Sequence, residues 1–125
     1  MGAAVPASPA ERGQPVFFCK PADALVLDGQ VPYARGTHDL HHEVELVVAL
    51  GADAPDGILD PAHADSLVYG YAVGLDLTRR DLQAAAKAKG LPWDTSKAFD
   101  QSAPVSAIVP AGEVADLAAR SLTLT

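Results

Sequence analysis

The stretch at positions 38–51, HDLHHEVELVVALG, constrains the fold more than any other part of the chain. β-Branched and apolar residues dominate its second half and a glycine closes it, which is typical of a strand. Residues i and i+2 of a strand point to the same face. Glu43 and Glu45 are therefore expected side by side, with Val44 and Leu46 on the opposite face. The run predicts a strand that brings two carboxylates together.

Neighbouring carboxylates repel each other, and partial burial raises the cost of ionising both. Exposure to water, a shared proton or a bound divalent cation would each relieve the repulsion. Carboxylate oxygens are the ligands that Mg²⁺, Mn²⁺ and Ca²⁺ prefer. Asp76, near the end of a second apolar run in YAVGLDLTRRD, is a candidate third ligand. The alternative is an edge strand with one face in water, which two glutamates alone do not exclude.

Histidines just before the glutamates offer a second metal hypothesis. His38, His41 and His42 could supply nitrogen ligands to zinc. Their spacing matches no standard zinc pattern and cysteine ligands are missing from the run, so a histidine-rich surface loop is the favoured interpretation.

Composition narrows the class of protein. The 125 residues fit one domain, and the net charge of −7 disfavours a nucleic-acid partner, because phosphate backbones are bound by excess Lys and Arg. Cys19 is the single cysteine, which favours a reducing compartment. The sequence has neither a secretory signal pattern nor an apolar run of the ~18 residues that a membrane span needs. We expect a cytoplasmic protein without a membrane partner.

The remaining segments indicate an α+β fold that is mainly β. Residues 1–15, rich in Ala, Pro and Ser, are typical of an extended lead-in, and residues 16–125 would form the domain. The pattern predicts about six short strands, at 15–21, 24–30, 43–51, 71–77, 105–110 and 121–125, with a loop at 91–104 and a short helix near 62–67.

One clear helix is predicted over residues 80–90. Three consecutive alanines favour it, Gly90 suits its C-terminal end, and Thr78 with Asp81 could form a capping box at its start. Arg80 and Gln83 are three residues apart and share a helix face. Arg80 could bind a carboxylate through its planar fork, while Gln83 could donate and accept hydrogen bonds. A solvated helix face is the plainer alternative.

Lys97 lies between Trp93 and Phe99, so its ammonium could be partly sheltered. A lysine beside a carboxylate-bound metal could stabilise a developing enolate. Taken alone, Lys97 would be a surface residue.

Together the segments FFCKPADALV, LHHEVELVVALG, YGYAVGLDLTRRDLQ and KGLPWDTSKAFDQSAPVS resemble the fumarylacetoacetate hydrolase family, and within it the acylpyruvate hydrolases, which include fumarylpyruvate hydrolase. The resemblance covers most of the chain from about Val16 onward and implies part of a mixed β-sandwich roll. It implies that Glu43, Glu45 and Asp76 bind Mg²⁺ or Mn²⁺. It also implies that Lys97 is catalytic and that Arg80 and Gln83 bind the substrate.

The implied activity is hydrolytic cleavage of a carbon–carbon bond in a small 1,3-dicarbonyl acid such as fumarylpyruvate. A related isomerase or oxaloacetate-type decarboxylase, and an inactive metal-binding fragment that needs a partner chain, remain alternatives. Family members commonly form homodimers. They also carry a His-Glu pair upstream, which activates water, and a Gly- and Thr-rich region downstream. The sequence is therefore expected to be an internal part of the catalytic domain, without robust activity by itself.

Overall fold

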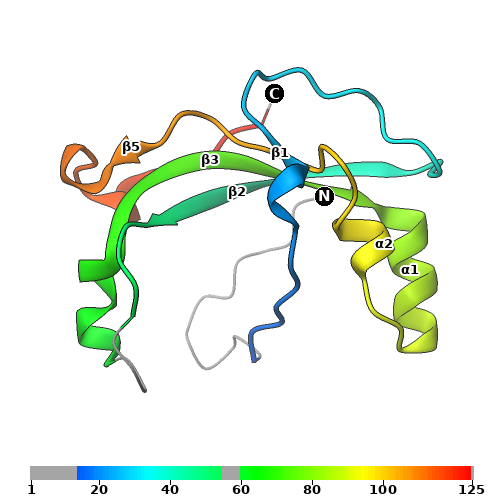
Figure 1. The fold of residues 1–125 in the computed structure, drawn as a ribbon, viewed down its shortest axis with the longest axis horizontal. Helices are drawn as coiled ribbons and strands as arrows, with labels where there is room; N and C mark the ends of the chain where they lie inside the picture. The colour runs from blue at the N-terminus through cyan, green and yellow to red at the C-terminus, as the bar shows by residue number, and fades with distance from the viewer. Residues whose placement is uncertain (1–13, 55–59, 125) are drawn as a thin grey trace.

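The computed structural model describes residues 14–54 and 60–124. Its central feature is a long antiparallel pair, β2 (Leu40–Leu50) and β3 (Val68–Arg79), joined at the far edge of β3 by the short β5 (Val109–Pro110). The pair forms a curved arch, and helical segments descend from both of its ends on the same side (Figure 1). The strand predicted at 43–51 and the strand predicted at 71–77 are therefore confirmed, and each is longer than expected.

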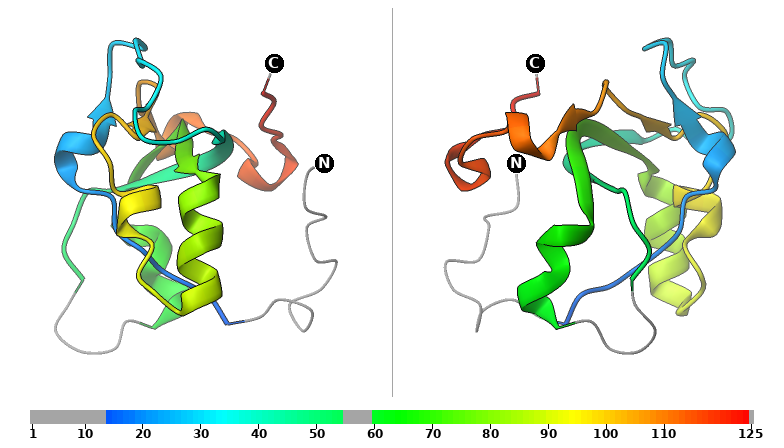
Figure 2. Two further views of the ribbon diagram at one scale, coloured as in Figure 1. Left: turned by 90° about the vertical axis from the view of Figure 1, so that its right-hand side faces the viewer. Right: turned by 60° about the vertical axis from the view of Figure 1, so that its left-hand side comes forward.

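The remaining elements are short. β1 (Leu25–Val26) pairs in parallel with β4 (Ala103–Pro104) as a separate two-stranded sheet. α1 (Arg80–Lys89) follows β3 without a loop, and α2 (Asp94–Lys97) packs beside it, as both views in Figure 2 show. Single-turn and longer 3₁₀ helices occupy Ala22–Ala24, Pro61–Leu67, Ala111–Glu113 and Leu117–Ala119. The architecture is α+β, as predicted.

The predicted helix is confirmed, but its predicted cap is wrong. Gly90 ends α1 in the left-handed conformation with φ 63°, as expected. Arg79, not Thr78, occupies the N-cap, and Thr78 is fully buried as a residue of β3. Asp81 instead accepts hydrogen bonds from the Thr37 hydroxyl at 2.6 Å and the His38 amide at 3.0 Å. Asp81 therefore ties the helix start to the segment before β2.

Several short predicted strands do not form. Described residues 14–21 are extended without strand pairing, and only Leu25–Val26 of the second predicted strand pairs. The predicted 105–110 strand is reduced to β5, and the predicted loop at 91–104 contains α2 and β4. Residues 121–124 form no strand, and the rest of that prediction, like most of the lead-in at 1–15, lies outside the described residues. These runs are short, and the described residues offer them little to pair with.

The interior is small and largely polar. Within residues 14–54 and 60–124 the buried apolar side chains are few, and three of them are alanines: Ala24, Val26, Ala72, Leu77, Ala86 and Phe99. The largest fully buried side chains are Lys97, Thr78, Ser96 and Ser102, all at one end of the arch. By contrast, Leu46, Val48 and Leu50 on β2 are exposed. None of the described helices is long and apolar enough to cross a membrane. Burial in this chain is concentrated around charged groups.

Candidate metal centre and active site

The strand register brings the three predicted acids together. Glu43 on β2 lies directly opposite Asp76 on β3. Glu45 is two residues along β2 and so shares the face of Glu43. One carboxylate oxygen from each of the three residues lies within 4.8 Å of those from the other two. We call Glu43, Glu45 and Asp76 the carboxylate cluster. Asp76 is far from the two glutamates in the sequence, and the antiparallel pairing of β2 and β3 brings it to them.

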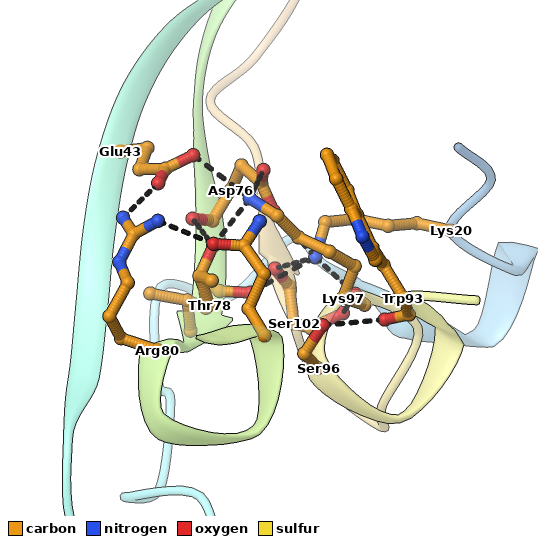
Figure 3. A network of polar contacts seen from close by, with 11 residues as sticks. Lys20, Glu43, Asp76, Thr78, Arg80, Trp93, Ser96, Lys97 and Ser102 are labelled. Atoms are coloured by element: carbon orange, nitrogen blue, oxygen red, sulfur yellow. Dashed lines mark hydrogen bonds and ion pairs between the residues drawn. The ribbon is translucent and has the colours of Figure 1, made fainter. Parts of the chain in front are cut away.

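Lys97 lies at the centre of the cluster's contacts (Figure 3). Its side chain is only 2% exposed. Its ammonium donates to Glu43 Oε2 at 2.9 Å, to Thr78 Oγ1 at 2.6 Å and to Asp76 Oδ2. α2 positions this lysine, because it directs the side chain from the helix toward β2 and β3. The prediction that Lys97 is sheltered near the acids agrees with this geometry.

The aromatic shelter of Lys97 differs from the one expected. Its ammonium lies 4.9 Å from the centre of the Phe18 ring. Trp93 instead faces the Lys87 ammonium at 4.6 Å, and Phe99 faces the Arg79 guanidinium at 4.2 Å. The segment before β1, and not the residues flanking Lys97, therefore supplies the ring over the lysine.

Arg80 and Gln83 lie at the edge of the cluster. Arg80 Nη1 donates to Gln83 Oε1 at 2.6 Å, and Arg80 Nη2 donates to Glu43 Oε1. Gln83 is buried, whereas the Arg80 side chain is about one-third exposed at 32%. The predicted shared helix face is confirmed, and Arg80 is the group of the pair that an incoming anion could reach.

The two glutamates differ in their surroundings. Burial raises the pKa of Glu43, but the hydrogen bonds from Lys97 and Arg80 outweigh it and hold that pKa below its ordinary value. Burial, assisted by the charge of Asp76, raises the pKa of Glu45. Within the described residues Glu45 has no hydrogen-bonded or ion-paired partner. Glu45 is exposed, so water solvates it, and it is the acid of the cluster whose charge the described side chains compensate least.

The cluster fits a hard divalent cation. Three carboxylates offer the oxygen ligands that Mg²⁺, Mn²⁺ and Ca²⁺ prefer. Asp76 is 4% exposed, and its Oδ1 is a buried oxygen that accepts no hydrogen bond. That oxygen lies 2.8 Å from Lys20 Nζ, an ion-pair distance without hydrogen-bond geometry. The exposed Glu45, and the buried Asp76 whose Oδ1 meets only the Lys20 ammonium, are the carboxylates of the cluster that a cation could join.

The histidines do not form the alternative zinc site. Among the described residues, the only group of three or more potential ligands is the carboxylate cluster. His41 Nε2 lies 3.0 Å from Asp39 Oδ1, and His42 lies beside Leu75 and Leu77 on the other face of the sheet. The surface interpretation of these histidines agrees with the geometry.

A hollow of about 330 Å³ opens next to the cluster. Glu45, Asp76 and Lys20 contribute its polar groups. The rest of the lining is mostly apolar, from Phe18, Leu25, Val47, Gly74, Leu75, Ala103 and Val105. A small molecule in this space would have the carboxylate cluster on one side and apolar side chains on the other.

Two residues that contact the carboxylate cluster or Lys97 were not predicted as site residues. Lys20 contacts Asp76, and Thr78 accepts from Lys97. The signal for Lys20 was a lysine embedded in the apolar run VFFCKP. Thr78 lies two residues after Asp76 and shares its face in β3, whereas the capping-box pattern places it at the start of the helix.

Comparison with known proteins identifies the family of the chain. Residues 1–125 match the family described as fumarylacetoacetate (FAA) hydrolase, C-terminal. A fumarylpyruvate hydrolase of Ralstonia is 46% identical over 98 residues, covering 78% of this chain and 50% of the relative. An oxaloacetate tautomerase of Escherichia coli is 43% identical over 115 residues, covering 90% and 48%. A mitochondrial oxaloacetate decarboxylase of Dictyostelium discoideum is 41% identical over 106 residues, covering 83% and 48%.

A solved structure gives the same result. Fumarylpyruvate hydrolase from Pseudomonas aeruginosa, in complex with Mn²⁺ and pyruvate, is 46% identical with a TM-score of 0.74, covering 83% of this chain and 46% of that one. The chain spans about half the length of the curated relatives it matches. The match over the whole sequence, together with these relatives, shows that the chain belongs to the fumarylacetoacetate hydrolase family.

Proposed function

We propose that this chain carries the metal- and substrate-binding residues of an acylpyruvate-type hydrolase, which cleaves a carbon–carbon bond in a small 1,3-dicarbonyl acid such as fumarylpyruvate. The observation that carries the proposal is the carboxylate cluster, three acids within 4.8 Å of one another beside a buried lysine. The relatives support an enzyme, and the Ralstonia and Pseudomonas proteins support this reaction. The specific substrate rests on similarity to those two proteins.

In this proposal Glu43, Glu45 and Asp76 hold Mg²⁺ or Mn²⁺. A bound divalent cation would act as a Lewis acid toward the substrate's oxygens. The Mn²⁺ and pyruvate in the Pseudomonas structure support both the type of cation and a small keto acid as ligand. Ca²⁺ has the same oxygen preference and is the third candidate.

The other residues would supply charge and orientation. Lys97 would place its ammonium where negative charge develops on the departing enolate, and a preorganised charge in a buried site is more effective than one in water. Arg80 would exchange Glu43 for the substrate carboxylate, binding it through two parallel N–H groups. Gln83 is buried and accepts from Arg80 through its Oε1; its amide N–H₂ would bind a carbonyl or hydroxyl oxygen once the substrate draws Arg80 away.

A second candidate reaction is tautomerisation or decarboxylation of oxaloacetate. The observation that favours it is the 41–43% identity to the Dictyostelium and Escherichia proteins, close to the 46% for the hydrolases. Both reactions form a negatively charged enolate, so the same charged groups could stabilise either reaction. A third candidate is an inactive metal-binding fragment that needs a partner chain. Homodimer formation and the cytoplasmic location stay predictions.

Turnover of three substrates separates these candidates. The chain, with Mg²⁺ or Mn²⁺, would be given fumarylpyruvate, acetylpyruvate and oxaloacetate, and the products would be identified. We expect pyruvate plus a second carboxylic acid from the acylpyruvates. Release of carbon dioxide without a second acid, or keto–enol exchange alone, would overturn the hydrolase. Activity that appears only after addition of a chain carrying the rest of a full-length relative would favour the third candidate.

Matched variants connect the activity to the cluster. Glu45→Gln removes one proposed ligand and keeps the side-chain shape, whereas Glu113→Gln makes the same change at an exposed glutamate in a 3₁₀ helix. We expect Glu45→Gln to abolish Mn²⁺ binding and turnover and Glu113→Gln to retain both. Equal binding by the two variants would contradict the assignment of Glu45 as a ligand.

A further inference from the structure

Lys20 makes a set of contacts that the proposed reaction does not use. It belongs to an extended segment before β1, and its side chain is 15% exposed. Its ammonium donates to Leu77 O at 3.2 Å, to Ser102 O at 3.1 Å and to Lys97 O. The three acceptors are 57 to 82 residues away in the sequence. One side chain therefore joins the end of β3, the end of α2 and the segment before β4. Figure 3 shows Lys20 beside Lys97 and Ser102.

The same ammonium also faces the carboxylate cluster. Its three N–H donors are directed at carbonyl oxygens, and Asp76 Oδ1 lies 2.8 Å from it. Asp76 is consequently held between two ammonium groups, with Lys20 at Oδ1 and Lys97 at Oδ2. A carboxylate with both oxygens fixed in this way has little freedom to rotate.

Lys20 fixes the second lysine as well. Lys97 O accepts from the Lys20 ammonium and from Ser102 Oγ at 3.0 Å, which anchors the backbone from which the Lys97 side chain extends. Two residues before Lys20, Phe18 places its ring 4.9 Å from the Lys97 ammonium. The segment from Phe18 to Lys20 thus contacts Lys97 at its backbone and at its charged end.

Burying an ammonium is costly, and a role in stability alone does not require one. Desolvation lowers the pKa of Lys20, opposed by the charge of Asp76. Packing at this position could be achieved by an apolar side chain without that cost. What a lysine adds is a positive charge fixed beside a proposed metal ligand and bonds to three backbone segments of the site.

We propose that Lys20 is a positioning residue of the carboxylate cluster, holding Asp76 through its Oδ1 and the Lys97 backbone through its carbonyl. The proposal rests on the proposed function for the identity of Asp76 as a ligand. Groups that orient metal ligands from the next layer out typically change metal affinity about 10–100-fold when removed. Lys20 is expected to fall in that range.

The test is Mn²⁺ binding by the 125-residue chain, followed through the electron paramagnetic resonance signal of the free ion. Lys20→Met removes the charge and keeps the length of the side chain. Lys20→Arg keeps the charge, but its planar fork cannot address three carbonyls in the same way. Lys89→Met is the matched control, because it removes the charge of an exposed lysine on α1.

We expect Lys20→Met to bind Mn²⁺ about 10–100-fold more weakly than the wild type, Lys20→Arg to lie between the two, and Lys89→Met to be unchanged. Circular dichroism at the temperature of the titration establishes that the variants are folded. A folded Lys20→Met with affinity within about twofold of the wild type would overturn the proposal, because a purely structural lysine would give that result.

A measurement on the wild type covers the case in which Lys20→Met does not fold. The ammonium resonance of Lys20, observed by ¹⁵N-detected NMR, is expected to shift as Mg²⁺ saturates the chain, with the Lys89 resonance unchanged. Saturation without a shift at Lys20 would overturn the proposal.

Failure of the proposed function gives a different result. If the wild type binds neither Mn²⁺ nor Mg²⁺, the metal site is wrong, and Asp76→Asn then decides the role of Lys20. A shifted Lys20 ammonium resonance in Asp76→Asn would support the coupling of Lys20 to Asp76. An unshifted resonance would refute it.

Discussion

Replacing Lys97 by methionine is expected to destabilise the fold strongly. Lys97 is the largest fully buried side chain in the described part of the chain, and it is charged. Methionine has a similar length but carries no charge and no donor. Asp76 would lose its partner at Oδ2, Glu43 its partner at Oε2, and the buried Thr78 hydroxyl its donor. The substitution therefore leaves negative charge in a poorly solvated place.

The structure sets the size of the effect. Removing one partner of a buried ion pair costs about 3–5 kcal/mol. The lower end applies, because Asp76 keeps Lys20 at 2.8 Å and the one-third-exposed Glu43 keeps Arg80. A loss of about 3 kcal/mol is a large share of the roughly 5–15 kcal/mol that holds a domain folded. With a urea slope of about 1.5 kcal/mol per molar, the unfolding midpoint would fall by about 2 M.

Urea unfolding followed by circular dichroism measures this shift. Lys89→Met serves as the control and is expected to stay within about 0.5 kcal/mol of the wild type, as exposed substitutions usually do. If Lys97→Met also stayed within that margin, the three contacts of the ammonium would not be formed in solution, and the argument for a buried charged network would fail.

Three further predictions concern the acids and the end of α1. Mn²⁺ affinity is expected to weaken as the pH falls below about 5, because Glu45 and its partners must be ionised to bind; calorimetric affinity that is constant down to pH 4 would contradict this. The Thr37 hydroxyl and the His38 amide lower the pKa of Asp81 in the folded protein. The contribution of Asp81 to stability is therefore fully present above its unfolded pKa of about 4, and it is lost as the pH falls through the lower pKa of the folded state. Asp81→Asn should therefore be less stable than the wild type at pH 7, with the difference in unfolding free energy closing only in strong acid; a difference independent of pH would refute the pairing. Gly90→Ala should cost about 1 kcal/mol in urea unfolding, since φ is 63° there, whereas Gly112→Ala, at a glycine without positive φ, should cost clearly less; equal losses would exclude backbone strain as the cause.

The locally encoded features were predictable from the sequence. Alternation and β-branching identified β2 and β3, and the alanines with Gly90 identified α1. The side-by-side placement of Glu43 and Glu45 follows from the two-residue period of a strand. The shared face of Arg80 and Gln83 follows in the same way from the helical period, and the structure adds the hydrogen bond between them.

The predictions of the short strands and of the helix cap were wrong, because tertiary contacts competed there with the local sequence signal. Thr78 has the chemistry of an N-cap, but β3 continues through it and buries it, so its hydroxyl accepts from Lys97 instead. The run at 15–21 is rich in strand-forming residues, yet Lys20 within it satisfies backbone carbonyls through its side chain and not through a ladder.

By itself the sequence determined which residues could share a face, because strand and helix periods act over two to four positions. Only the tertiary structure decided that Asp76 lies opposite Glu43, that Lys97 is buried between them and that Lys20 closes the network from a segment more than fifty residues away. Those relations depend on strand register and chain crossings over long separations, which are fixed by the balance of burial and charge over the whole fold.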